Sequence, residues 1–312
     1  MLAELYGLPD GYEVLLGNGG ATFVWDAAAF GLVRERAQHC VFGEFSSKFA
    51  KATAAPHLTK PEVLDAPPGS LATASAQEGV DLYAWPHNET STGVSAPVVR
   101  PTGIGDALVA VDGTSAAGGI ELDVTQTDLY YFAPQKSFAA DGGLWFALAS
   151  PAAVERIGEI AGSGRYIPES LSLAVALENS RADQTLNTPA IATLLMMRSQ
   201  LEWMLAGGGL SAMAARSRES SDAIYAWAEA SEFATPFVAN PAHRSPVVAT
   251  VDLDDAVSSE RLQGILRANG VVDVFPYRKL GRNQLRIGVY PAVDPEDVHK
   301  LLAAIDWVVS HW

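Results

Sequence analysis

Short apolar runs alternate with longer amphipathic segments through the first two thirds of the chain. Each of five runs is rich in β-branched or aromatic residues, and a sixth, GGLWFALAS, follows at 142–150. Between the first two runs, the glycines at 17, 19 and 20 precede ATFVWDAAAFGLV, which predicts a helix that opens on a glycine-rich turn. The alternation predicts an α/β fold with a mainly parallel sheet. The five runs are YEVLL (12–16), HCVF (39–42), DLYAW (81–85), ALVAV (107–111) and DLYYF (128–132).

A second pattern begins after three consecutive glycines at 207–209. Residues 189–205 carry apolar positions at helical spacing and predict a long helix that ends at these glycines. We therefore expect a large domain over residues 1–208, with its sheet flanked by helices, and a small C-terminal α+β domain over 209–312. The Pro-, Ala- and Ser-rich stretch 61–75 predicts a surface loop. Within the small domain we expect helices at about 210–230, at 260–269 and from Pro295, which Asp294 caps, and strands at 245–253, 271–277 and 284–290.

Composition and charge narrow the class of protein. The 312 residues exceed one ordinary core, and 48% hydrophobic with 18% charged residues is typical of a globular protein. With 36 acidic and 21 basic residues the formal charge is -15, which repels nucleic acid and anionic lipid. Cys40 is the only cysteine, and the histidines lack metal-ligand spacing. We expect a soluble, cytoplasmic protein without a metal site, and with neither nucleic acid nor a membrane as partner.

Two reactive side chains follow strands of the predicted sheet. Asp112 ends the run ALVAV, and Lys136 lies just past DLYYF. Because parallel strands end at one crevice, both side chains can face one ligand. A lysine there can form an imine with an aldehyde cofactor, and a carboxylate can keep a pyridine nitrogen protonated. A solvated lysine and a helix-capping aspartate remain the alternatives for this pair alone.

Two further features predict anion binding. GNGGAT (17–22) leads into a helix, and free amide groups at a helix N-terminus bind phosphate; an ordinary tight turn is the alternative. The segment lacks GxGxxG spacing and a GK[ST] ending, so a dinucleotide site or a P-loop is not favoured. Arg286 lies inside the apolar run QLRIGVY, where an unpaired guanidinium would be costly. We expect it to meet a carboxylate or an anionic ligand.

A resemblance to a known family is carried by six blocks that cover almost the whole chain in order. YYFAPQKSFAADGGLWFALASP (130–151) resembles the Schiff-base lysine segment of the phosphoserine aminotransferases, especially their actinobacterial members, among the class V enzymes of fold type I that depend on pyridoxal 5'-phosphate (PLP). The other blocks are GNGGATFVWDAAAFGL near the start, HNETSTG (87–93), VDGTSAAGG (111–119), QTLNTPAIATL (184–194) and YRKLGRNQLR (277–286).

The resemblance implies a role toward PLP for each matching position. Lys136 would hold the cofactor covalently, Asp112 would pair with the ring nitrogen, and Thr90 would contact the ring near its hydroxyl group. Phe45 stands where many relatives stack a tryptophan on the ring. The resemblance also implies a homodimer with shared sites. The cofactor phosphate would be held by Ala21, Thr22 and Gln135, with Asn187 and Thr188 reaching it across the dimer interface.

The implied reaction transfers an amino group from L-glutamate to 3-phosphohydroxypyruvate. It gives O-phospho-L-serine and 2-oxoglutarate in serine biosynthesis, and phosphohydroxythreonine of pyridoxine biosynthesis is a second implied substrate. The resemblance assigns Arg286 to the substrate α-carboxylate and Arg282 to the substrate phosphate. Arg244 is the weaker candidate, for which a structural role is favoured.

Several alternatives to this interpretation stay open. One is another class V PLP enzyme, such as a cysteine desulfurase or an alanine-glyoxylate transaminase, although Cys40 lies in a strand pattern rather than a mobile loop. Another is a PLP-fold protein without turnover, and a third, from fold class alone, is a nicotinamide oxidoreductase. The matching blocks begin at once, whereas relatives first carry a segment with an S-H-R motif. Either the true start lies upstream of Met1 or the protein works with a reduced substrate site, and in both cases we expect this chain to bind PLP but to be a poor transaminase.

Overall fold

The computed structural model describes residues 1–312, and its largest element is a seven-stranded sheet with the order β1-β9-β8-β7-β4-β2-β3. Only β9 runs against the other strands: it pairs antiparallel with β1 and β8, whereas the remaining neighbours pair parallel. The predicted mainly parallel sheet is confirmed. Its strands are β1 (Glu13–Asn18), β2 (Ala37–Val41), β3 (Glu62–Asp65), β4 (Leu82–Pro86), β7 (Leu108–Asp112), β8 (Leu129–Phe132) and β9 (Leu144–Ala149).

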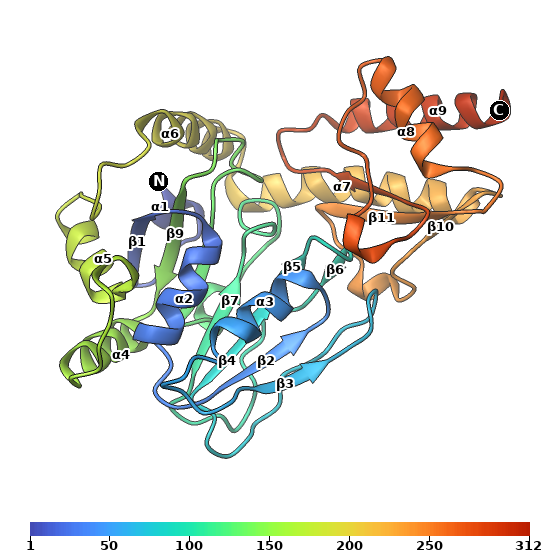
Figure 1. Ribbon diagram of the computed structural model, residues 1–312. Helices are drawn as coiled ribbons and strands as arrows, with labels where there is room; N and C mark the ends of the chain where they lie inside the picture. The colour runs from blue at the N-terminus through green and yellow to red at the C-terminus, as the bar shows by residue number, and fades with distance from the viewer.

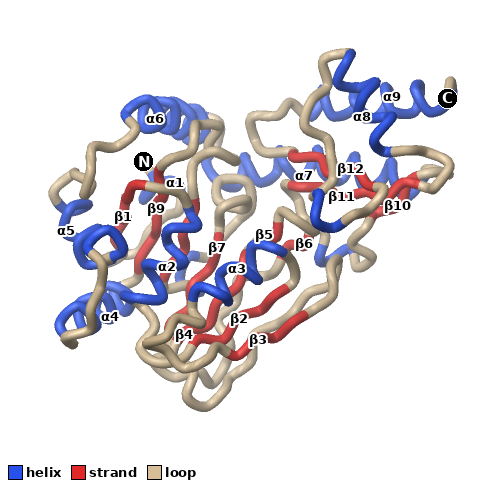
Figure 2. The backbone as a smooth tube through the Cα atoms, in the orientation of Figure 1, coloured by secondary structure: helices blue, strands red, loops and turns tan.

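Helices cover both faces of this sheet because successive strand residues point to opposite sides. On β8, Tyr130 and Phe132 join one hydrophobic core with α1 and α6, and Leu129 and Tyr131 join a second core with α2 to α5. Figure 1 shows α2 and α3 lying over the strands, and Figure 2 shows the strands between the helical layers. These helices are α1 (Leu2–Leu5), α2 (Ala21–Gly31), α3 (Glu44–Ala52), α4 (Pro151–Gly162), α5 (Leu173–Arg181) and α6 (Ile191–Ala206).

The C-terminal third forms a smaller unit around its own core. Its three-stranded antiparallel sheet has the order β10-β11-β12 and packs with α7, the long helix that leads away from the large sheet in Figure 1. Gly208 precedes α7 with φ +105°, a conformation that favours glycine. We propose that the domain boundary falls here, between residues 208 and 209. The elements are α7 (Gly209–Ala230), β10 (Ala234–Pro236), β11 (Val248–Leu253), α8 (Ser259–Ala268), β12 (Gln284–Gly288) and α9 (Pro295–Ser310).

Two segments differ from the sequence-based prediction. Residues 61–75 are not a loop throughout, because β3 adds to β2 as the edge strand of the large sheet; its side chains alternate between half-buried and exposed, so it shows no apolar run. Residues 271–277 form no strand: Asp273 has φ +64°, which interrupts extended backbone, and Val274 packs into the small core while Val272 stays exposed. None of the helices is both long and apolar enough to cross a membrane.

Candidate active site

Lys136 lies in the loop after β8, at the edge where the parallel strands end. Its Nζ is 3.5 Å from Thr90 Oγ1 and 5.9 Å from the centre of the Tyr290 ring. Burial lowers the pKa of Lys136 to about 8, and the Arg286 guanidinium acts in the same direction, while Asp112 and Glu89 oppose it. An amine that is partly neutral near physiological pH can act as a nucleophile or a base.

This lowered pKa predicts how Lys136 reacts in the protein without ligand. Because only the neutral amine is acylated, its rate of labelling by acetic anhydride should rise with pH and level off above about pH 8. Lys279 and Lys300 are matched internal controls, since ion pairs raise their pKa values and their labelling should rise past about pH 10. Peptide mass spectrometry measures all three rates together. Parallel pH profiles for the three lysines would contradict the assignment.

Asp112 ends β7 and is 8% exposed. Its Oδ1 accepts a hydrogen bond from the Thr114 backbone N–H at 2.8 Å, and its Oδ2 accepts one from Trp25 Nε1 at 3.3 Å. Trp25 Nε1 also donates to Tyr131 Oη at 2.9 Å. Burial raises the pKa of Asp112, and these donors act against that rise. A cationic group placed at this carboxylate would offset the remaining cost of burying its charge.

Arg286 reaches the same place from β12 in the small unit. Its Nη1 donates to the Thr90 carbonyl oxygen at 3.3 Å, and the guanidinium lies 5.6 Å from the centre of the Tyr277 ring. The Phe45 ring is 6.0 Å from that of Tyr277. Burial lowers the pKa of Arg286, and the charged or titratable groups that act on it are Tyr290 and Tyr277 rather than a carboxylate. A carboxylate, one of the two expected partners of Arg286, is thus not found within this chain.

The first turn of α2 offers free backbone donors close to this cluster. Ala21 and Thr22 are the first two helical residues, and no side chain caps the helix at Gly20. Trp25, which reaches Asp112, follows one turn later and therefore lies on the same helical face. The N-terminal turn of α2 is consequently suited to an anion near Asp112. Gln135, next to Lys136 in the chain, is exposed.

Three predicted residues lie apart from Lys136 in this chain. The Asn18 side chain donates to the carbonyl oxygens of Asn187 and Thr188 at 3.1 and 3.5 Å, and these two residues are exposed beside the end of β1. Arg282 donates from Nε to Asp252 Oδ1 at 3.0 Å and stacks over the Phe237 ring. Within one chain, these three residues are therefore held by groups other than Lys136 and Asp112.

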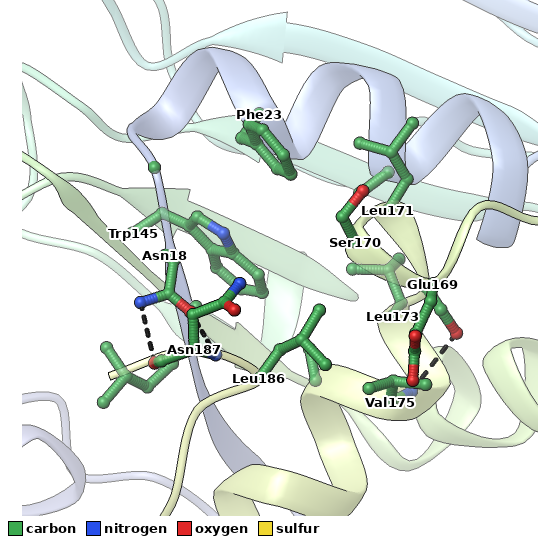
Figure 3. Close-up of a pocket in the computed structure, with 16 residues that line it drawn as sticks. Asn18, Phe23, Trp145, Glu169, Ser170, Leu171, Leu173, Val175, Leu186 and Asn187 are labelled. Carbon is green, nitrogen blue, oxygen red and sulfur yellow. Dashed lines mark hydrogen bonds between the residues drawn. The ribbon is translucent and has the colours of Figure 1, made fainter. Parts of the chain in front are cut away.

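A pocket near Asn187 is separate from the cluster around Lys136. Figure 3 shows it between the end of β1, the start of α2 and the segments around 169–176 and 186–187, with Trp145 and Phe23 among its walls. Neither Lys136 nor Asp112 lines it. Arg244, the remaining arginine of the sequence analysis, forms an ion pair with Glu229 at 2.6 Å and lies over the Tyr225 ring.

Four residues that complete the cluster were not predicted from the sequence. Trp25 and Tyr131 hold Asp112, whereas Tyr290 and Tyr277 lie against Lys136 and Arg286. Trp25 could have been found from its place one helical turn after Thr22. Tyr277, Tyr290 and Tyr131 carried no such signal, because aromatic residues beside apolar strands are equally common in an ordinary core.

Comparisons with known proteins agree with the family resemblance carried by the six sequence blocks. The family model for class-V aminotransferases, "Aminotransferase class-V", matches residues 62–301. A protein of a Nocardioides species named phosphoserine aminotransferase is 60% identical over 313 residues, covering 99% of this chain and 84% of the relative. A Rhodococcus opacus protein of the same name is 58% identical over 310 residues, covering 99% of this chain and 83% of the relative.

Solved structures share the fold. A phosphoserine aminotransferase from Cytophaga hutchinsonii superposes with a TM-score of 0.89 at 24% identity, covering 98% of this chain and 85% of that one. The enzyme of the same name from Bacillus circulans subsp. alkalophilus gives 0.85 at 22% identity, over 98% and 82% of the two chains. The chain belongs to the class-V aminotransferase family. The resemblance to the phosphoserine aminotransferases is thereby confirmed.

Proposed function

We propose that this chain is a PLP-dependent phosphoserine aminotransferase. It transfers an amino group between L-glutamate and 3-phosphohydroxypyruvate and so forms O-phospho-L-serine and 2-oxoglutarate. The observation that carries this proposal is the convergence of three groups at one sheet edge: the Lys136 amine with its lowered pKa, the buried Asp112 carboxylate and the Arg286 guanidinium without a carboxylate partner. An amine, an anion and a free cation are what a transaminase needs toward its cofactor and an amino acid.

The residues at this edge fit PLP. Within two residues of Asp112, Lys136 and Thr90 in the chain, three buried polar atoms lack a hydrogen-bond partner and could receive one from a polar ligand: Thr114 Oγ1, Ser137 Oγ and Asn88 Oδ1. Lys136 would hold the cofactor, Asp112 its ring nitrogen, Thr90 and Phe45 its ring, and Ala21, Thr22 and Gln135 its phosphate. When bound, PLP supplies a protonated pyridine ring that accepts electrons from the substrate α-carbon.

Each protein group has a defined task in this proposal. Arg286 binds the substrate α-carboxylate with its forked donors and thereby orients the α-carbon toward Lys136. The Lys136 amine then removes the α-proton of the amino acid as general base in one half-reaction and delivers a proton to the α-carbon of the keto acid as general acid in the other, for which a pKa of about 8 is well matched. Trp25 and Thr114 orient the Asp112 carboxylate, which stays anionic beside a cationic ring nitrogen. The small unit contributes Arg286, so both units build the site.

A second copy of the chain completes the proposed site. Asn187 and Thr188 are exposed and held in place by Asn18, ready to contact the phosphate bound by a partner subunit. On the adjoining helix α6, apolar side chains are exposed, which favours an interface there. We place the homodimer in the cytoplasm, where a single reduced cysteine is common. The exposed residues are Ile191, Leu195, Met196 and Trp203.

A cysteine desulfurase is not favoured by the surroundings of Cys40. The residue is buried in β2, and burial raises the pKa of its thiol to about 12. A desulfurase requires an accessible thiolate, which this position does not provide. Of the class V alternatives, the desulfurase is therefore not supported by this chain.

Product formation tests the proposal. The protein is incubated with PLP, L-glutamate and 3-phosphohydroxypyruvate, and O-phospho-L-serine is measured by mass spectrometry. We expect product that depends on both substrates, and less product when pyruvate or glyoxylate replaces the phosphorylated keto acid. Phosphohydroxythreonine, run in the reverse direction with 2-oxoglutarate, tests the second substrate. Faster turnover of glyoxylate than of 3-phosphohydroxypyruvate would replace this proposal by an alanine-glyoxylate transaminase.

Arg286→Lys should raise KM for L-glutamate and for the keto acid together, by about tenfold or more, because a point charge cannot reproduce the guanidinium fork. Arg244→Lys is the matched control, since Arg244 also lies over a tyrosine ring but binds Glu229.

Arg282→Ala should raise KM for the phosphorylated substrate alone. Equal losses for glutamate and 3-phosphohydroxypyruvate in Arg282→Ala would contradict the assignment of Arg282 to the phosphate, and unchanged KM values in Arg286→Lys would remove Arg286 from the site.

A further inference from the structure

One buried carboxylate next to the site has no task in the mechanism above. Glu89 ends the short strand β5 (Asn88–Glu89), which pairs with β6 (Val94–Ser95), and it is 0% exposed. Its carboxylate accepts five hydrogen bonds, three from backbone N–H groups and two from serine hydroxyls. The donors are Phe45 N at 3.3 Å and Ser91 N at 3.3 Å, Ser46 N and Ser46 Oγ at 2.9 Å each, and Ser91 Oγ at 2.6 Å.

These bonds fix the start of α3. The helix has no cap from its own N-cap residue, Gly43, and Glu89 instead accepts from the second and third helical N–H groups, those of Phe45 and Ser46. Ser91 Oγ accepts from the first, that of Glu44, at 3.0 Å. A side chain at Gly43 would lie 2.3 Å from Glu89 Cγ, so the carboxylate is packed directly against this turn. The N-terminus of α3 is thus closed to an external anion, unlike that of α2.

The same carboxylate is tied to the reactive lysine through its neighbour in the chain. Thr90 follows Glu89 directly, its Oγ1 lies 3.5 Å from Lys136 Nζ, and its carbonyl oxygen accepts from Arg286. Phe45 and Thr90 come from different elements. Glu89 connects them, because its carboxylate accepts a hydrogen bond from the Phe45 backbone N–H and its own backbone continues into Thr90. We propose that Glu89 is a positioning residue, whose carboxylate sets Phe45 and Thr90 at fixed places around Lys136. This inference rests on the proposed function, because it concerns the PLP site.

The Glu89 side chain acts on the site through both its charge and its shape. The charged or titratable groups around the Lys136 nitrogen are Glu89, Asp112, Arg286 and Tyr290. The negative charge of the Glu89 carboxylate favours the protonated form of this nitrogen. Glu89→Gln keeps the volume of the side chain but removes its charge and turns one acceptor oxygen into a donor that faces N–H groups. The helix start and the Thr90 turn should then separate. A displacement of about 1 Å in such groups can cost about a hundredfold in rate.

A matched control separates positioning from stability. Asp128 is also buried, accepts hydrogen bonds from Val109 N at 2.8 Å and Ser150 Oγ at 2.8 Å and pairs with Arg100, but it lies at the other end of the sheet. Asp128→Asn and Glu89→Gln should both lower the urea midpoint of unfolding. Only Glu89→Gln should reduce kcat, by about tenfold to a hundredfold, and move the pH midpoint of the visible absorbance of the PLP holoenzyme to lower pH.

The experiment therefore records urea unfolding, kcat and the pH titration of the absorbance for wild type and both variants, each loaded with PLP. An equal response of Glu89→Gln and Asp128→Asn in kcat and absorbance would overturn the inference and leave Glu89 a structural residue. If Glu89→Gln does not fold, Ser91→Ala replaces it, with a smaller loss of kcat expected and an unchanged kcat overturning the inference. A wild-type protein that shows no absorbance with PLP would instead refute the proposed function, so the two failures are distinct.

Discussion

Lys136→Ala is expected to abolish transamination. Lys136 is the only lysine at the edge of the sheet shared with Asp112 and Thr90, and its lowered pKa suits it to both covalent attachment and proton transfer. Loss of a positioned general base alone costs about 10²- to 10⁴-fold, and loss of covalent attachment adds to that. The variant should keep the fold, because Lys136 forms no ion pair. Formation of O-phospho-L-serine from L-glutamate and 3-phosphohydroxypyruvate is the measurement.

Lys60→Ala serves as the control for this variant. Lys60 is exposed, and its side chain forms no hydrogen bond or ion pair in the structure, so the substitution should leave turnover unchanged. Circular dichroism and urea unfolding of both variants show whether the fold is retained. Turnover by Lys136→Ala at the wild-type rate would remove Lys136 from the mechanism.

Asp112→Ala is expected to lower kcat by about a hundredfold or more, because the field that holds the ring nitrogen protonated is lost. Affinity for PLP should fall less, since the N-terminal turn of α2 still binds the phosphate. Stability should also fall, by about 1–3 kcal/mol, because the Trp25 and Thr114 N–H groups lose an acceptor in a buried setting. Steady-state kinetics, PLP titration and urea unfolding separate the three effects.

Asp128→Ala tests whether any buried carboxylate of the sheet would behave in this way. Asp128 is as buried as Asp112, accepts backbone and hydroxyl hydrogen bonds and also pairs with Arg100, so at least as large a loss of stability is expected without a loss of kcat. A wild-type kcat in Asp112→Ala would refute the assigned electrostatic role of Asp112. A matching fall of kcat in Asp128→Ala would show that the effect arises from destabilisation instead.

The sheet and most helices could be predicted from the sequence because their signals are local. Each central strand is an apolar run, and α9 begins with a capping aspartate and a proline at its first turn. The strand β3 and the irregular segment 271–277 were predicted wrongly. In the first, alternate residues are only half-buried and the others are exposed, which is the pattern of a polar edge strand. In the second, the apolar residues pack without extended backbone, and Asp273 takes a left-handed conformation.

From the sequence, only those site residues could be predicted whose charged side chain stands out in or next to an apolar strand. Lys136, Asp112 and Arg286 stand out, since a lysine, an aspartate and an arginine at apolar strands or their ends need partners. Their convergence depends on how β5, β12 and the loop after β8 meet, which no local pattern encodes. Glu89 shows this most clearly: in HNETSTG it is one polar residue among several, and only the fold reveals that it is buried against α3.

The most direct test of the central claim is the visible absorption spectrum of the purified protein with PLP, recorded before and after addition of L-glutamate. Lys136-bound PLP absorbs in the visible or near-ultraviolet range, and transfer of the amino group from glutamate should bleach this absorbance. Subsequent addition of 3-phosphohydroxypyruvate should restore it as O-phospho-L-serine forms. A spectrum that shows bound PLP but does not change with glutamate would contradict the assignment of this chain as a glutamate-dependent aminotransferase.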